Sequence, residues 1–280
     1  MTVTLTLLGT GSPGCHPNLY QSAAALVVDE MPYVIDCGGG AVQRLAVARA
    51  NGQPALALHK LNTLILTHLH PDHSAGLADF IISTWINGRR RPLKIYGPAG
   101  TAKMTALLVE AYELGIAEHL DSEAPTFWPL RYEVIEYTAG EIITTPTVIV
   151  TAFRVEHGGL ETYGLKFATA SKTVVFSADT RPHPAVIEHG KGCDMLVHEV
   201  YSERGLTENP RPHMRLGYFR NMHTSTVELA KIANEIRPKK LILTHQMHLS
   251  PISDDELLQE ITDRYDGEVI FGRDLGVYEA

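Results

Sequence analysis

The sequence of 280 residues is poor in cysteine and in long apolar runs. Its three cysteines, Cys15, Cys37 and Cys193, are too few and too scattered for a disulfide framework, which favours a reducing compartment. No run approaches the ~18 apolar residues of a membrane-spanning helix, and the N-terminus lacks the basic segment and cleavage site of a secretion signal. We therefore expect a cytoplasmic protein without a membrane partner.

Positive charge is also scarce, because 24 basic residues face 32 acidic ones and the formal net charge is −8. A broad nucleic-acid-binding surface is normally basic, so we do not favour nucleic acid as a partner, although a local basic site is compatible with this balance. Histidine is abundant instead, with 14 residues. Histidine is a weak helix former whose special roles are acid–base chemistry and metal binding, so this excess indicates a chemical site.

The apolar pattern predicts strands and helices that alternate in the outer thirds of the chain, with a strand-rich middle. This is α/β (α+β) organisation. We expect strands at Val3–Leu8, Ala23–Val28, Tyr33–Ile35, Thr63–Leu66, Leu93–Tyr96, Tyr132–Tyr137, Val148–Val155, Lys172–Phe176, Met195–Val197, Lys240–Leu243 and Glu268–Phe271. We expect helices at Ala41–Ala50, Ser74–Trp85, Ala99–Glu118, Thr224–Ile236 and Asp254–Tyr265.

One five-residue segment occurs twice. Leu64-Ile-Leu-Thr-His68 returns as Leu241-Ile-Leu-Thr-His245, and each copy is an apolar strand that ends in a histidine. Ligands of open α/β sheets usually lie at the C-terminal ends of strands. Residues 1–280 are therefore expected to form a single domain made of two similar halves that face one site, with chance repetition of common strand residues as the alternative.

The most informative segment contains His68, His70, Asp72 and His73 within six residues, between a predicted strand and a predicted helix. Imidazole and carboxylate groups suit zinc, manganese or iron. Four such donors exceed what one short loop usually supplies to a single tetrahedral ion, so the cluster indicates two metal ions.

This His-x-His-x-Asp-His segment resembles the signature of the metallo-β-lactamase superfamily of dinuclear metal hydrolases. Other motifs follow in the order that this family uses: Gly9-Thr-Gly-Ser12, Asp36-Cys-Gly-Gly39, His157, Ser177-Ala-Asp179-Thr180 and His245. Within the superfamily, His198-Glu199 and His223-Thr-Ser225 are most similar to ribonuclease Z and its relatives, including arylsulfatases and small phosphodiesterases. The resemblance implies a four-layer αββα sandwich, with two mixed sheets between outer helices, and suggests a homodimer.

The resemblance also implies a ligand set. His68, His70 and His157 would hold one metal ion, while Asp72, His73 and His245 would hold the other, and Asp179 would bridge the two. Zinc is the first expectation, with manganese or iron as alternatives. A hydroxide shared by two cations forms near neutral pH and would be the nucleophile. Asp36 is expected to orient the loops rather than to bind metal.

Three residues are expected to be catalytic: His223 and Glu199 in proton transfer, and Asp72 as a metal ligand. His223 is expected to donate a proton to the leaving alkoxide, with Glu199 as its orienting partner. The alternative is that His223 caps the helix predicted from Thr224. His198 is expected to lie behind the ligands.

The candidate substrate residues lie in two segments. The segment Ser202–Met222 looks irregular and carries several cations, and a basic loop here would hold an anionic ester through Arg211, His213 and Arg215. A solvated loop with scattered charges is the alternative. His16, in the loop after the first strand, would line the mouth of the site.

The expected reaction is hydrolysis of a small anionic ester, a phosphodiester first, with arylsulfatase or lactonase activity on the same metals as the alternative. Cleavage of tRNA 3′ ends is disfavoured, because ribonuclease Z usually carries a long arm for tRNA. His157 and Asp179 are only 22 positions apart here, which leaves no room for an arm between them. A non-enzymatic metal sensor or scaffold would more readily lack some ligands, and all seven are present.

Overall fold

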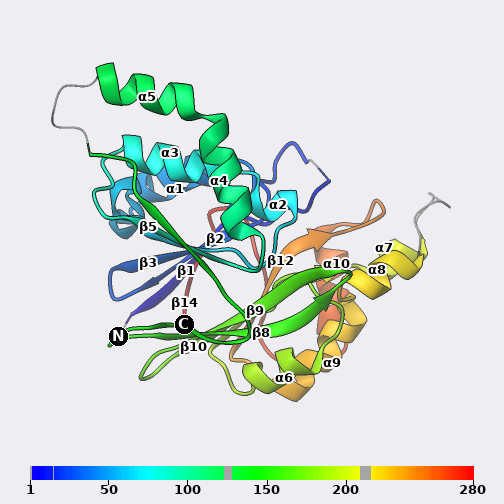
Figure 1. The fold of residues 1–280 in the computed structure, drawn as a ribbon. Coiled ribbons are helices and arrows are strands. Elements are labelled where there is room, and N and C mark those ends of the chain that lie inside the picture. The colour runs from blue at the N-terminus through cyan, green and yellow to red at the C-terminus, as the bar shows by residue number, and fades with distance from the viewer. Residues whose placement is uncertain (1, 15, 123–127, 209–215) are drawn as a thin grey trace.

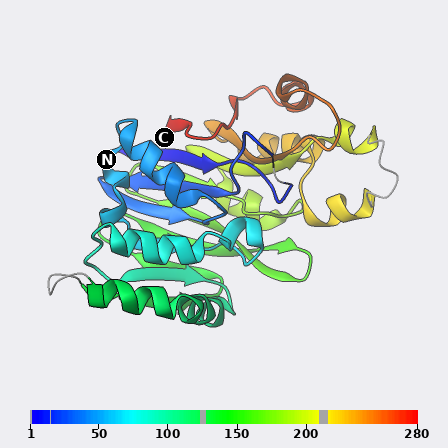
Figure 2. The same ribbon diagram turned by 90° about the horizontal axis from the view of Figure 1, so that it is seen from above.

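The computed structural model describes residues 2–14, 16–122, 128–208 and 216–280. Two seven-stranded sheets pack face to face, and helices cover the outer face of each (Figures 1 and 2). This arrangement confirms the predicted four-layer αββα sandwich. No helix of the described part of the chain is long and apolar enough to cross a bilayer.

The first sheet has the strand order β14-β1-β2-β3-β4-β5-β6. Its strands are β1 (Val3–Gly9), β2 (Ala23–Val28), β3 (Met31–Ile35), β4 (Thr63–Ile65), β5 (Leu93–Gly97), β6 (Tyr132–Glu136) and β14 (Val277–Glu279). Its helical elements are α1 (Ala41–Ala50), η1 (Pro54–Leu56), η2 (Leu58–Lys60), α2 (Pro71–Ser74), α3 (Leu77–Ile86), α4 (Thr101–Ala111) and α5 (Glu113–Ser122).

The second sheet has the strand order β13-β12-β11-β10-β9-β8-β7. Its strands are β7 (Gly140–Thr144), β8 (Ile149–His157), β9 (Leu160–Ala168), β10 (Thr173–Phe176), β11 (Met195–Tyr201), β12 (Lys240–Met247) and β13 (Val269–Phe271). Its helices are α6 (Pro184–Gly190), α7 (Glu203–Thr207), α8 (Leu216–Met222), α9 (Thr226–Ile236) and α10 (Asp254–Thr262).

The two sheets follow the same order of strand pairings. From β1 to β6, two antiparallel pairings precede three parallel ones, and the same order runs from β8 to β13. By this order, β4 of the first sheet occupies the place that β11 occupies in the second, and β5 the place of β12. The repeated segments Leu64–His68 and Leu241–His245 belong to β4 and β12, so they do not occupy matching places. The division into two similar halves stays a prediction, and the five-residue repeat does not support it.

Three layers of apolar side chains hold the sandwich together. One lies between the sheets and includes Leu5, Leu26 and Phe167, while the other two lie under the outer helices on either side. Residues that alternate along β1 and β2 therefore serve different layers, as expected for strands covered on both faces.

Several predicted elements differ from the observed ones. The helix expected at Ser74–Trp85 is divided into α2 and α3 at Gly76, and the one expected at Ala99–Glu118 is divided into α4 and α5. Strands β7, β9 and β14 and helix α6 were not predicted. The segment Ser202–Met222, expected to be irregular, contains helices α7 and α8. Their five and seven residues are too few for a clear helical period.

Candidate metal centre

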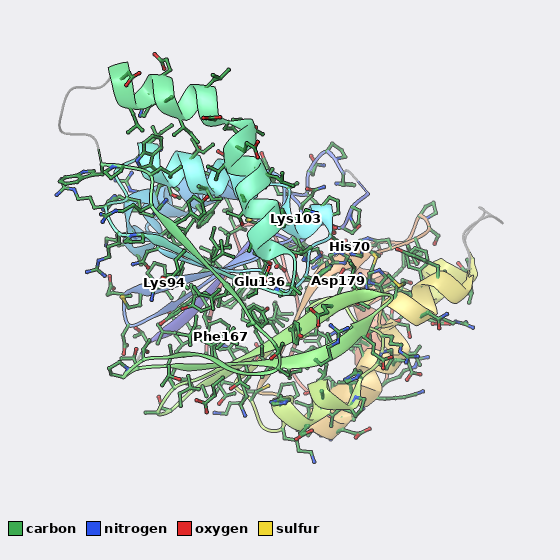
Figure 3. All side chains as sticks on the ribbon, in the orientation of Figure 1. His70, Lys94, Lys103, Glu136, Phe167 and Asp179 are labelled. Carbon is green, nitrogen blue, oxygen red and sulfur yellow. The ribbon has the colours of Figure 1, made fainter. Side chains whose placement is uncertain are left out.

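The seven predicted ligands converge at one edge of the sandwich. His68 to His73 follow β4 and enter α2, His157 ends β8, Asp179 follows β10, and His245 lies in β12. Figure 3 shows His70 and Asp179 near each other, although they come from opposite halves of the chain. Segments that are far apart in sequence therefore build one site.

Three histidines form the first group. The Nε2 atom of His68 and the Nε2 atom of His157 each lie 3.1 Å from Nδ1 of His70. Burial lowers the pKa of all three imidazoles, so their neutral forms, which offer lone pairs, are favoured. Three neutral nitrogen donors directed at one point are the chemistry of a divalent metal site.

The second group contains Asp72, His73, Asp179 and His245. The Nε2 atom of His73 lies 3.5 Å from Oδ2 of Asp72 and 3.4 Å from Oδ2 of Asp179. The Nε2 atom of His245 lies 3.1 Å and 3.3 Å from the same two oxygens. All four residues are buried. Asp179 Oδ2 is also 3.8 Å from Nε2 of His157, which places this carboxylate between the two groups.

A metal ion fits these residues, because a buried donor atom points into the second group without a partner. Nε2 of His73 is buried and makes no hydrogen bond within the described residues, although it lies between two carboxylates. Histidine neighbours hold the pKa of Asp179 well below its usual range despite burial, which alone would raise it. Burial alone would lower the pKa of His73, but the charges of Asp179 and Asp36 raise this pKa well above its usual range. The group therefore combines imidazole nitrogens with ionised carboxylates, which is the set that zinc, manganese and iron accept.

Hydrogen bonds to the far side of two imidazole rings fix their orientation. Asp36 accepts hydrogen bonds from the backbone N–H of Thr67 at 2.7 Å and from Nδ1 of His73 at 2.8 Å. Nδ1 of His157 donates to the carbonyl of Met222 at 2.7 Å. In both histidines the proton therefore lies on Nδ1, and Nε2 is left for a metal. This is the orienting role that the sequence predicted for Asp36.

Close backbone packing holds the ligand loop against the turn that carries Asp36. A Cβ on Gly38 would lie 2.2 Å from the carbonyl oxygen of Asp72, and one on Gly76 would lie 2.6 Å from the carbonyl oxygen of Gly38. Only glycine fits at these two places. Gly76 also separates α2 from α3, so the division of the predicted helix is part of the construction of the site.

His245 reaches the site through a β-bulge. Pairing between β11 and β12 shifts so that Glu199 faces Thr244 and Val200 faces Gln246, which leaves His245 as the extra residue. Its φ of 47° lies in the left-handed region. Bulges beside active sites turn a side chain away from the regular alternation of a strand, and here the bulge turns His245 toward Asp72 and Asp179.

His223 and Glu199 are paired as predicted. Nδ1 of His223 lies 2.9 Å from Oε2 of Glu199, and Oε1 of Glu199 accepts the backbone N–H of Thr180 at 2.8 Å. His223 does not cap the following helix, because the N-cap of α9 is Ser225. One atom of His223 lies within 4.8 Å of donor atoms of His157 and Asp179, so its ring lies beside the metal ligands.

Burial decides the protonation of this pair. Burial lowers the pKa of His223 and, together with the charge of Asp179, raises the pKa of Glu199 well above its usual range. Both shifts favour a neutral imidazole beside a protonated carboxyl. The pair still carries one proton for transfer, because its total charge is zero whether the proton lies on His223 or on Glu199.

The predicted substrate residues have different outcomes. His16 is exposed and lines a cavity of about 370 Å³ that His223 also lines. Arg211, His213 and Arg215 lie outside the described residues. The neighbouring cations of the segment Ser202–Met222 make ion pairs on the surface: Arg204 with Glu208 and Glu256, and Arg220 with Glu203.

Some site features were not predicted, or were placed differently. His198 points away from the metals, because the side chains of β11 alternate and Glu199 takes the inner face. The carbonyl of Met222 had no signal in the sequence, since any residue offers one. Tyr218 and Phe219, which line the cavity with His16, were missed because α8 was not recognised.

A four-layer αββα fold that gathers five histidines and two aspartates at one sheet edge defines a metal-dependent hydrolase. The chain belongs to the metallo-β-lactamase superfamily, since residues 32–246 match the β-lactamase superfamily domain.

Two similar relatives bear the name ribonuclease Z. The protein of Mycolicibacterium paratuberculosis is 31% identical over 282 residues, covering 98% of this chain and 96% of the relative. The protein of Mycobacterium bovis is 29% identical over 276 residues, covering 97% and 96%.

Solved structures share the fold at lower identity. The metallo-β-lactamase fold protein YhfI from Bacillus subtilis has a TM-score of 0.76 at 20% identity, with all of both chains covered. The short form of human tRNase Z has a TM-score of 0.71 at 20% identity, with 98% of each chain covered. A diphosphatase of the PhnP family has a TM-score of 0.68 at 19% identity, covering 99% of this chain and 98% of the other.

Proposed function

We propose that this protein hydrolyses phosphodiester bonds with two divalent metal ions, and that RNA is its first substrate class. The observation that carries the proposal is the set of seven buried or half-buried imidazole and carboxylate donors in two adjoining groups. Two ions of this kind lower the pKa of bound water to about 7 and stabilise the charge that develops on the phosphate.

Each ligand has one proposed place. His68, His70 and His157 would hold one ion, and Asp72, His73 and His245 would hold the other, with Asp179 shared between them. The distances of Asp179 Oδ2 from His73, His157 and His245, between 3.3 and 3.8 Å, support the bridging position. Zinc is the first expectation, with manganese and iron as alternatives.

The chain itself supplies orientation and a proton. Asp36 and the Met222 carbonyl keep His73 and His157 in the tautomer that leaves Nε2 unprotonated. His223 delivers the proton of its pair with Glu199 from Nε2 to the departing alkoxide. For this step the proton shared with Glu199 is on His223, and the leaving oxygen takes it as the P–O bond breaks.

RNA is placed ahead of a small ester because of the relatives. Two proteins named ribonuclease Z match this chain over 96% of their own length, so they have little room for a long arm that this chain lacks. The missing arm therefore does not separate this chain from them. RNA therefore comes before a small ester, whereas the net charge and the missing arm alone favoured the small ester.

A small phosphodiester is the second candidate. β8 and β9 are joined by only two residues, Gly158 and Gly159, and β10 follows β9 after a short turn, so nothing projects from this region to grip a folded RNA. A diphosphatase of the PhnP family is among the structural neighbours, which supports phosphate chemistry on this fold only.

Metal analysis of the purified protein coupled to a substrate panel tests the proposal. We expect about two ions per chain and faster cleavage of a precursor tRNA or single-stranded RNA than of bis-aryl phosphate, aryl sulfate or lactone. Faster turnover of the small diester than of RNA would make a small phosphodiester the first candidate substrate and RNA the second. Preferred turnover of sulfate or lactone, or inertness of the metal-loaded protein toward every ester, would refute phosphodiester hydrolysis. The homodimer and the cytoplasmic location stay predictions.

A further inference from the structure

We propose that the cavity beside His223 binds an aromatic base of the substrate next to the scissile bond. The cavity, called the ring pocket below, is walled by Leu19, Tyr218, Phe219, Met247 and Leu249 and also lined by His16, His223 and His248. This inference rests on the proposed phosphodiester hydrolysis and names the part of the substrate that the enzyme selects.

The size and position of the ring pocket suit part of a substrate. Its volume of about 370 Å³ lies in the range of small-molecule sites. His223 lines it and also lies beside His157 and Asp179 at the metal centre. A substrate group in the pocket would therefore lie close to the atom of His223 that faces the metal centre.

The aromatic character of the wall favours a flat ring over an alkyl chain. The rings of Tyr218 and Phe219 meet edge to face with centroids 5.3 Å apart, and Phe219 lies 6.1 Å from the ring of His223. Tyr218 is 48% exposed, so one face of an aromatic side chain is available at the mouth. Offset and edge contacts between aromatic rings stabilise a complex beyond the area that they bury, and an alkyl chain in the same place lacks this contribution.

Two histidines add polar atoms of opposite kind. Nδ1 of His16 accepts the backbone N–H of Asn18 at 3.2 Å, so its proton lies on Nε2, which is a donor. Nε2 of His248 lies 2.9 Å from Oδ1 of Asp254, so in the neutral ring Nδ1 is an acceptor. A nucleobase has both donors and acceptors along its edge, whereas a plain hydrocarbon ring has neither.

One side of the pocket is held in shape before any ligand arrives. Asp274 accepts the backbone N–H groups of Thr10 and Tyr20, each at 2.9 Å, and thereby closes the base of the loop that carries His16 and Leu19. The backbone N–H of Gln246 donates to the carbonyl of Thr10 at 3.1 Å and ties this loop to β12. A preformed pocket binds with less loss of conformational entropy than a loose one.

Equilibrium binding of two anions that differ only in the base tests the inference. Adenosine 5′-phosphate and ribose 5-phosphate share the sugar and the phosphate, so the ratio of their Kd values for the metal-loaded protein reports on the base alone. We expect adenosine 5′-phosphate to bind about tenfold more tightly, which corresponds to about 1.4 kcal/mol.

Variants place this preference in the ring pocket. Tyr218→Ala removes the exposed aromatic face, and Leu19→Trp fills the cavity without removing a wall. Both should reduce the ratio to less than about threefold. Tyr218→Phe keeps the ring and should keep the ratio. Tyr112→Ala, at an exposed aromatic residue after α4, is the control.

A ratio near one in the wild-type protein, or an unchanged ratio in both Tyr218→Ala and Leu19→Trp, would overturn the inference. The result is separable from the proposed function, because binding is measured without turnover. If the two variants abolish a base preference in a protein that cleaves no phosphodiester, the base-binding pocket is supported and the proposed hydrolysis is refuted. If the protein cleaves RNA but shows no base preference, the hydrolysis is supported and the base-binding pocket is refuted.

Discussion

The two sheets contribute to the metal centre in different ways. The first sheet supplies His68, His70, Asp72 and His73 from one short segment that follows β4 and enters α2. The second sheet supplies its three residues one at a time: His157 from β8, Asp179 from the loop after β10 and His245 from β12. Residues that are neighbours in sequence can therefore place several candidate ligands together without help from the rest of the fold. The contact between the two groups, through Asp179, depends on strands that meet only in the folded chain.

The largest effect is expected at the link between the two contributions. Asp179→Ala removes the carboxylate placed between both groups, so we expect activity to fall by about 10⁴-fold or more, equivalent to at least about 5.5 kcal/mol of transition-state stabilisation. Elemental analysis should show loss of metal from the variant, while circular dichroism reports on the fold. Full metal content with wild-type turnover would show that Asp179 is not a ligand.

The next largest effect is expected at His223, the proposed proton donor. His223→Ala should keep both metals and slow turnover by about a hundredfold to a thousandfold for esters with poor leaving groups, because their alkoxides need a proton. Esters with acidic leaving groups should be much less affected. A leaving-group series measured on wild type and variant checks this, and equal slowing across the series would exclude the general-acid role.

A smaller effect compares the supports of two ligands. Asp36→Asn exchanges the carboxylate that receives the proton of His73 for an amide, and we expect metal affinity or activity to fall about 10- to 100-fold. The matching support of His157 is the carbonyl of Met222, which Met222→Leu retains, so this control should bind metal normally. Titration of both apoproteins with zinc measures the difference. Equal affinities would mean that Asp36 supports the fold rather than the ligand.

The smallest effect concerns stability rather than catalysis. Burial lowers the pKa of His198 to about 4. Below the unfolded-state value of about 6.5 the unfolded chain takes up a proton that the folded chain refuses, so this histidine's contribution is complete above that pH and is lost as the pH falls. Between pH 6.5 and pH 5 the loss should be about 1.6 kcal/mol.

His198→Asn tests this in matched urea unfolding at the two pH values. The amide can replace the hydrogen bond from Nδ1 of His198 to the carbonyl of Glu199, at 2.7 Å, but does not titrate. The variant should therefore lose less stability over this range than the wild type. Identical pH dependence in both proteins would contradict the prediction.

Much of the fold could be predicted because most strands are continuous apolar runs. β2 and α1 begin and end at the predicted residues. β9 could have been predicted as well, because Tyr163, Leu165 and Phe167 alternate with Thr162, Gly164 and Lys166 at the period of a strand. The three residues of β14 are too few to show a period, and contacts with the neighbouring strand make this segment extended.

The sequence by itself determined the kind of chemistry, since three histidines and one aspartate within six residues already favour a divalent metal. It also determined the buried strands, because apolar runs must leave water. Only the tertiary structure decided the rest. The bulge at His245, the carbonyl of Met222 behind His157 and the ring pocket depend on backbone positions and long-range packing, which no local residue pattern encodes.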